Sequence, residues 1–284
     1  MYIDMDGNSY KTNLSRRRSL CVLTVGIFQQ NRVFSASLSA PTGDAILWAN
    51  RFTSEVDRRL EVPLADQTRY IELVEIAITE AKLNNLPTQA FVAVDRSDQV
   101  QAAMIILREA NGSWQWLGAV PVSTGKVGKF EHFVTPLGIF AHSLDNPDYR
   151  AEGTFNKKNI RGYGLRGRRV FDFGWQVAER GWGSGGTSKM RLQMHATDPT
   201  VLEPRLGTVA SEGCIRIPAT FNVFLDSHGV LDADYETAFA TGDKLWILKP
   251  HRTTVPWPGR YMVIVDSQTN SRPAWAALKN LTMK

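Results

Sequence analysis

Apolar side chains recur at helical spacing between residues 66 and 83. They occupy one face of a helix, at Tyr70, Val74, Ala77, Ile78 and Ala81. Asp66 stands where an N-cap residue is expected, and Pro87 lies beyond the end of the pattern. We therefore expect an amphipathic helix in an N-terminal helical segment over residues 41–89.

From residue 90 the pattern changes to short apolar runs that are typical of strands. Turn-forming residues separate these runs, and the Asn111-Gly112 pair is a strong hairpin signal. Glycine-rich stretches at 162–167 and 181–186 indicate long mobile loops, and a helix is expected from Thr220 to Leu225 after Pro218. The expected strands are Phe91–Val94, Ala103–Leu107, Trp114–Val120, Arg191–His195, Lys244–Leu248 and Tyr261–Val265. Residues 90–250 thus predict a mainly β, mostly antiparallel domain, followed by a C-terminal tail over residues 251–284.

The first 40 residues have the character of an export signal. Three arginines, Arg16 to Arg18, precede an apolar run from Leu20 to Phe28 that is too short for an ordinary membrane-spanning helix. Small residues follow the run, so we expect a signal peptide over residues 1–40 and export to a periplasm or cell envelope. The alternative is a short cytoplasmic helix.

The amino-acid composition and net charge give no indication of nucleic-acid binding and say little else about function. The chain has 284 residues, of which 43% are hydrophobic and 21% charged, and its formal net charge is +5. Residues 1–40 carry +3 of that charge, which leaves about +2 for the remainder. So small a charge does not indicate nucleic-acid binding.

A cysteine and a histidine form the candidate chemical site. Cys21 falls in the export signal, so Cys214 would be the single thiol of the mature protein, either an inert buried group or a reactive one. His195 lies nineteen residues before it and is a candidate base, and Gly213 lets backbone N–H groups face an oxyanion. Arg216 points to the same side as Cys214 on an extended segment and is suited to binding a carboxylate.

The motifs around these residues resemble those of the L,D-transpeptidases with a YkuD-type catalytic domain. The first is His-x-x-Asp-Pro from His195, followed by Leu206-Gly207 and by Ser-x-Gly-Cys-Ile-Arg from Ser211. The second, upstream, is Val122-Ser-Thr-Gly-Lys followed by Thr-Pro-x-Gly-x-Phe from Thr135. The resemblance covers roughly residues 90–250.

This resemblance implies a β-sandwich-like catalytic domain that transfers acyl groups in bacterial cell-wall peptides. Cys214 would attack the carbonyl between the diamino acid and D-Ala of a peptidoglycan tetrapeptide stem, with His195 as base. The carbonyl of Ala196 would orient the imidazole, and the amides around Gly213 would form the oxyanion hole. The thioester would pass to an amine of a second stem, giving a 3→3 cross-link in cell-wall biogenesis. Arg216 would hold the substrate carboxylate, and we expect Ser211, Glu212, Trp182 and Thr135 to contribute to substrate binding.

Several alternatives stay open. Water as acceptor would make the enzyme an L,D-carboxypeptidase or hydrolase, and the acceptor amine could also come from a free D-amino acid or a protein lysine. A wall-binding protein with an inactive catalytic fold is a third reading, although it would not need His195, Cys214 and Arg216 together.

Glu212 departs from the family, many members of which carry histidine there. Its carboxylate would raise the thiol pKa if it faced the sulfur, or attract the acceptor ammonium if it faced outward. We expect no metal and no organic cofactor, and the resemblance implies acylation of the thiol by carbapenems. His132 could line the cleft or be an ordinary surface histidine. Tyr163 and the arginines 161, 166, 168 and 169 would meet anionic or glycan parts of the wall, or simply be solvated.

Overall fold

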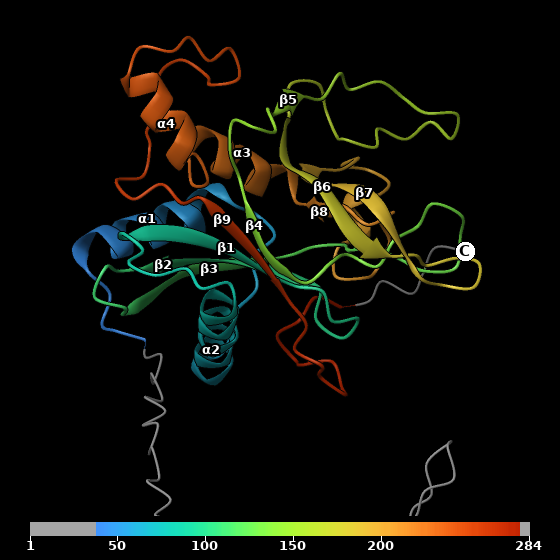
Figure 1. Ribbon diagram of the computed structural model, residues 1–284, viewed down its shortest axis with the longest axis horizontal. Coiled ribbons are helices and arrows are strands. Elements are labelled where there is room, and N and C mark those ends of the chain that lie inside the picture. Colours follow the sequence, from blue (N-terminus) through green and yellow to red (C-terminus); the bar gives the residue numbers. More distant parts are fainter. Residues whose placement is uncertain (1–37, 279–284) are drawn as a thin grey trace, which may run out of the picture. The chain divides into compact units, whose positions relative to one another are not determined.

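The computed structural model describes residues 38–278, which contain four α-helices and nine strands (Figure 1). Their buried apolar side chains form two clusters. The predicted signal peptide, including Cys21, therefore lies almost wholly outside the described residues. The elements in chain order are α1 Gly43–Glu55, α2 Leu64–Glu80, β1 Gln89–Asp95, β2 Ala102–Arg108, β3 Trp114–Pro121, β4 Gly138–Ala141, β5 Tyr149–Arg150, β6 Arg169–Glu179, β7 Thr187–Ala196, the 3-10 helix η1 Glu203–Arg205, β8 Ile215–Ile217, α3 Ala219–His228, α4 Ala233–Ala240 and β9 Tyr261–Val265.

The first sheet has five strands in the order β3-β2-β1-β9-β4. Neighbours pair antiparallel, except that β1 and β9 are parallel. The β2–β3 hairpin turns at the predicted Asn-Gly pair, where Gly112 has a φ of +88°. The C-terminal strand β9 therefore lies inside the sheet, between the first strand and β4.

Both faces of this sheet are covered, which explains why β1 is a continuous apolar run and not an alternating one. Helix α2 packs on one face through Tyr70, Ile71, Val74 and Ile78. On the other face α1 packs against β3, where Gly118 leaves room for the ring of Phe52. A Cβ at position 118 would lie 2.2 Å from that ring.

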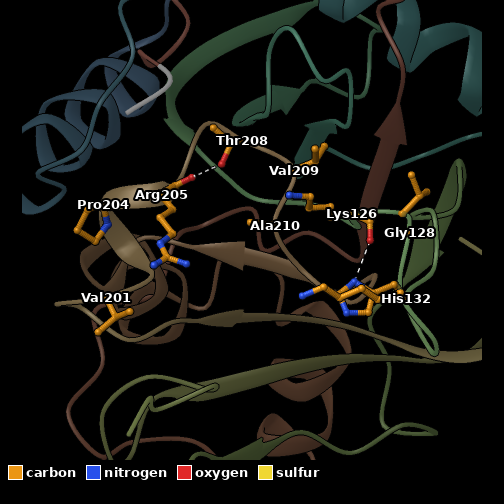
Figure 2. A pocket seen from close by; sticks show the side chains of 11 residues that line it. Lys126, Gly128, His132, Val201, Pro204, Arg205, Thr208, Val209 and Ala210 are labelled. Carbon is orange, nitrogen blue, oxygen red and sulfur yellow. Dashed lines mark hydrogen bonds between the residues drawn. The ribbon is translucent and has the colours of Figure 1, made fainter. Parts of the chain in front are cut away.

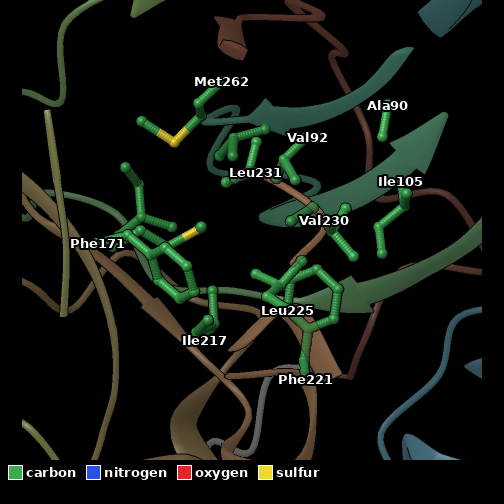
Figure 3. Packing of buried hydrophobic residues seen from close by; sticks show 14 of the residues in the cluster. Ala90, Val92, Ile105, Phe171, Ile217, Phe221, Leu225, Val230, Leu231 and Met262 are labelled. Carbon is green, nitrogen blue, oxygen red and sulfur yellow. The ribbon is translucent and has the colours of Figure 1, made fainter. Parts of the chain in front are cut away.

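The second sheet has four strands in the order β5-β6-β7-β8, antiparallel except for the parallel pair β7–β8. Its inner face shares one apolar cluster with the first sheet, α1 and α3; Figure 3 shows Val92 and Ile105 of the first sheet facing Phe171 and Ile217 of the second. The protein is thus a mixed fold of two sheets and few helices, in broad agreement with the mainly β prediction.

Two local predictions were wrong. Residues 244–248 do not form a strand, because the chain turns at 246–248 and leaves Trp246 72% exposed while burying Ile247. Asp66 is not the N-cap of α2: the helix begins after Pro63, and the Asp66 carboxylate instead accepts a hydrogen bond from Trp275 Nε1 at 2.9 Å.

None of the helices within residues 38–278 is long and apolar enough to cross a membrane.

Candidate active site

The candidate base comes from the outer face of β7. Met190, Leu192 and Met194 of this strand point into the core shared by the two sheets. Because side chains alternate along a strand, Arg191, Gln193 and His195 project from the opposite face. The predicted strand thus ends with His195 on the side away from the core.

The short strand β8 brings Arg216 to the same face and places the candidate nucleophile next to it in the chain. Ile215 and Ile217 are buried in the core, so Arg216 lies on the other side, whereas Cys214, in the bend before the strand, packs partly against the core. The parallel register pairs His195 with Arg216 and Met194 with Ile215. Cys214 directly precedes Ile215, and a backbone hydrogen bond links its thiol to Gln193, two residues before His195.

The His195 imidazole is held as a neutral base. Its Nδ1 lies 2.7 Å from the carbonyl oxygen of Ala196, and since a carbonyl only accepts, Nδ1 carries the proton. Burial lowers the pKa of His195 to about 4, with a smaller contribution in the same direction from the positive charge of Arg216. The ring is therefore uncharged near neutral pH, and Nε2 keeps its lone pair.

The Cys214 thiol is also neutral at rest. The side chain is partly buried, and Sγ donates to the Arg191 carbonyl oxygen at 3.6 Å. Burial raises the thiol pKa to about 11; a hydrogen bond from the backbone of Gln193 and the charge of Arg216 act against that rise, while Glu212 adds to it. The thiol thus rests against the backbone of β7 as an uncharged group.

The turn before Cys214 requires glycine. Gly213 has a φ of +129°, and a Cβ there would lie 2.9 Å from the end of the Met190 side chain. Its N–H donates to Ser211 Oγ at 3.1 Å, and the Ser211 hydroxyl in turn donates to the Cys214 carbonyl at 2.5 Å. The Ser211 hydroxyl is therefore occupied with the turn, and so is the amide of Gly213 that was expected to face an oxyanion.

Thr135 ties the turn to the loop of the upstream motif. Its buried hydroxyl donates to the Gly213 carbonyl at 2.7 Å and accepts from the Gly125 N–H at 2.9 Å. Backbone bridges join Gly125 to Ser211 and Ser123 to Arg216 alongside it. The two motifs, some 80 residues apart in sequence, are thereby brought into one structural unit, with Thr135 in its interior.

Arg216 and Glu212 supply the charges nearest the thiol. Arg216 Nη1 donates to the Ala210 carbonyl at 2.8 Å, and its Nε is buried without a hydrogen-bond partner among the described residues. Burial lowers the pKa of the guanidinium, and Glu212 partly opposes that change. Glu212 itself is exposed. Arg216 thus keeps donor capacity beside Cys214.

Trp182 lies farther out, in the hairpin loop between β6 and β7. Its ring packs edge-on against Phe133, at 4.8 Å between centroids, and against Phe130 at 5.7 Å. Phe133 in turn contacts the region of Gly213. Trp182 is therefore a contact between the hairpin tip and the loop over residues 126–133.

A polar network that was not predicted lies next to His195. The Gln193 amide donates to the buried Asp172 carboxylate at 2.8 Å and accepts from the hydroxyls of Tyr163 and Tyr149 at 3.2 and 3.4 Å. The Tyr163 ring also packs on the His195 imidazole, with centroids 4.5 Å apart. The period of two along β7 places Gln193 on the face of His195, and this signal was available in the sequence.

The arginines near Tyr163 differ in their surroundings. Arg169, which we expected to be solvated or to face the wall, is fully buried and pairs with Asp148 at 2.5 Å and Asp232 at 2.8 Å. Arg161 stacks over Phe155 at 3.8 Å, whereas Arg166 is exposed. Arg169 therefore belongs to the interior and not to a substrate surface.

Within residues 38–278 no group of three or more histidine, cysteine, aspartate or glutamate side chains is placed to hold a metal ion. No protein-family model matches the chain, and no curated protein is similar enough to count as a relative.

Proposed function

We propose that the chain is a cysteine acyltransferase of the L,D-transpeptidase type, which acts on tetrapeptide stems of peptidoglycan. The observation that supports the proposal is that a thiol, a neutral imidazole with Nδ1 fixed, and an arginine gather where β7 ends and β8 begins. The sequence motifs that contain these residues support the substrate class. Because peptidoglycan lies in the cell envelope, this function also requires that the chain be exported.

The first half-reaction begins with a movement of the thiol. Cys214 turns from the Arg191 carbonyl toward His195 Nε2, which takes the thiol proton as sulfur attacks the substrate carbonyl. Because both groups are neutral at rest, the proton moves during the attack and not before it. The C–N bond to D-Ala then breaks, the imidazolium returns its proton to the leaving amine, and a thioester on Cys214 remains.

The second half-reaction repeats the proton transfers with an acceptor amine. His195 Nε2 removes a proton from the attacking amine, and the thiol is regenerated as the new amide forms. Arg216 binds a carboxylate of the stem near the sulfur. An oxyanion hole requires that the Gly213 N–H leave Ser211 Oγ, or that the amide of Cys214 serve alone.

The test uses the protein with disaccharide-tetrapeptide, analysed by mass spectrometry beside Cys214→Ala. A dimer linked between diamino acids, absent from the variant, is the expected product. Tripeptide and free D-Ala without dimer would instead identify a carboxypeptidase that shares the acyl-enzyme. Absence of any Cys214-dependent product and of any carbapenem adduct on Cys214 would refute the proposal, and Cys21→Ala is the matched control that should keep full activity.

A further inference from the structure

A groove of about 730 Å³ lies between two loops beside the candidate active site (Figure 2). One wall comes from residues 126–132, between β3 and β4, and the other from residues 201–210, between β7 and β8. Figure 2 shows Lys126 and His132 on one side and Arg205 and Thr208 on the other. This volume lies within the range of pockets that bind small ligands.

The lining carries positive charge without negative charge. Lys126, Lys129 and Arg205 line the groove, and no aspartate or glutamate does. Among the described residues no ion pair links any of these three side chains to a carboxylate. His132 adds a ring nitrogen, because Nδ1 donates to the Lys126 carbonyl at 2.8 Å and leaves Nε2 available. Within residues 38–278 these three cations therefore have no carboxylate partner in an ion pair.

The groove lies next to the turn before Cys214, but the thiol does not line it. Ala210 lines it and precedes Ser211, and the Lys126 N–H donates to the Ser211 carbonyl at 2.9 Å. Neither His195 nor Cys214 is part of the lining. The positive charge of Arg205 also acts on Arg216 and lowers its pKa, although the carboxylate of Glu212 acts more strongly in the opposite direction.

We propose that this groove binds a ligand with at least two negative charges, as phosphate or carboxylate groups, held by Lys126, Lys129 and Arg205. Bound anions would neutralise the three cations and relieve the repulsion between Arg205 and Arg216. The apolar side chains of Val127, Val201 and Val209 contact the uncharged parts of such a ligand. The site is a property of the two loops and does not rest on the acyl-transfer chemistry.

Isothermal titration calorimetry of the full chain with two probes tests the proposal. Pyrophosphate represents phosphate ligands, and citrate represents carboxylate ligands. At least one probe should bind saturably at low ionic strength, and more weakly as salt is added. The variant K126A/K129A/R205A should bind at least tenfold more weakly. The matched control, K157A/K158A/R166A, removes three exposed cations elsewhere and should bind as the wild type does.

The probe that binds more tightly identifies the preferred group. Failure of both probes to saturate, or equal weakening in the two triple variants, would overturn the proposal, provided that circular dichroism shows both variants folded. Cys214→Ala should bind the probes as the wild type does. Loss of acyl transfer in that variant with binding retained separates the groove from the proposed catalysis, and either can fail without the other.

Discussion

The thiol of Cys214 should be alkylated slowly at neutral pH, and its rate should keep rising up to strongly alkaline pH. With a pKa of about 11, about 1 thiol in 10,000 is ionised at pH 7, against about 1 in 30 for an unperturbed cysteine. A thiolate of higher pKa is intrinsically more nucleophilic, which recovers about tenfold of that difference. The net expectation is alkylation about 30-fold slower than for an exposed cysteine, with a slope near one in log rate against pH between 7 and 10.

Charge variants should shift this rate in opposite directions. Glu212→Gln removes a charge that raises the thiol pKa, so it should speed alkylation, whereas Arg216→Met should slow it. Glu152→Gln, at an exposed position in another loop, is the control and should change nothing. The assay is intact-mass spectrometry after timed reaction with iodoacetamide, in a Cys21→Ala background so that Cys214 is the only thiol.

His195→Gln is the decisive variant in this series. A neutral imidazole contributes no charge, so the variant should alkylate within about twofold of the wild type. A rate plateau between pH 7 and 9 in the wild type, together with a large loss of rate in His195→Gln, would show a preformed thiolate–imidazolium pair. That result would refute the assignment of two neutral groups.

Three further predictions concern stability, each measured by chemical denaturation. Thr135→Val should lower the free energy of unfolding by about 1–4 kcal/mol, because the Gly213 carbonyl and the Gly125 N–H lose their hydrogen bonds. Thr237→Val, at an exposed helical position, is the control and should lower it little; equal losses in the two variants would contradict the role of the Thr135 hydroxyl. Arg169→Met should cost about 3–5 kcal/mol, because two buried carboxylates lose their partner, and a loss below 1 kcal/mol would be inconsistent with the pairing. The folded pKa of His195, about 4, lies below the value of about 6.5 for an unfolded chain, so about 3 kcal/mol of stability should disappear as the pH falls from 6.5 to 4. His195→Asn should remove that part of the pH dependence. If stability depended on pH in the same way in the variant, the low pKa of His195 would be contradicted.

Local pattern was sufficient for the parts of the site that lie on strands. The run Arg191–His195 predicted a strand with His195 at its end, and β7 confirms it. The two-residue spacing predicted that Cys214 and Arg216 point to the same side, but Cys214 lies in the bend before β8 and packs partly against the core. Alternation along β7 would have found Gln193. The strands β1 to β3 were predicted from their short apolar runs, which are bounded by turn-forming residues.

Contacts between distant segments were not predictable in this way. The hydroxyl of Thr135 is occupied by residues 125 and 213, and the partners of Arg169 are spread from residue 148 to residue 232. Neither pairing leaves a periodic trace in the sequence. Lys244–Leu248 has strand-like composition, but no neighbouring strand pairs with it, and composition alone could not reveal that.

The position of β9 has a consequence for the order of events during synthesis. β1 to β3 leave the ribosome first, but the strand that joins β1 to β4 is made some 165 residues after β1. Until then β1 has an open edge, with backbone groups that no neighbour satisfies. The nascent chain therefore cannot complete its first sheet until nearly all of it has been made, and β1 to β3 wait for a strand that is encoded close to the C-terminus.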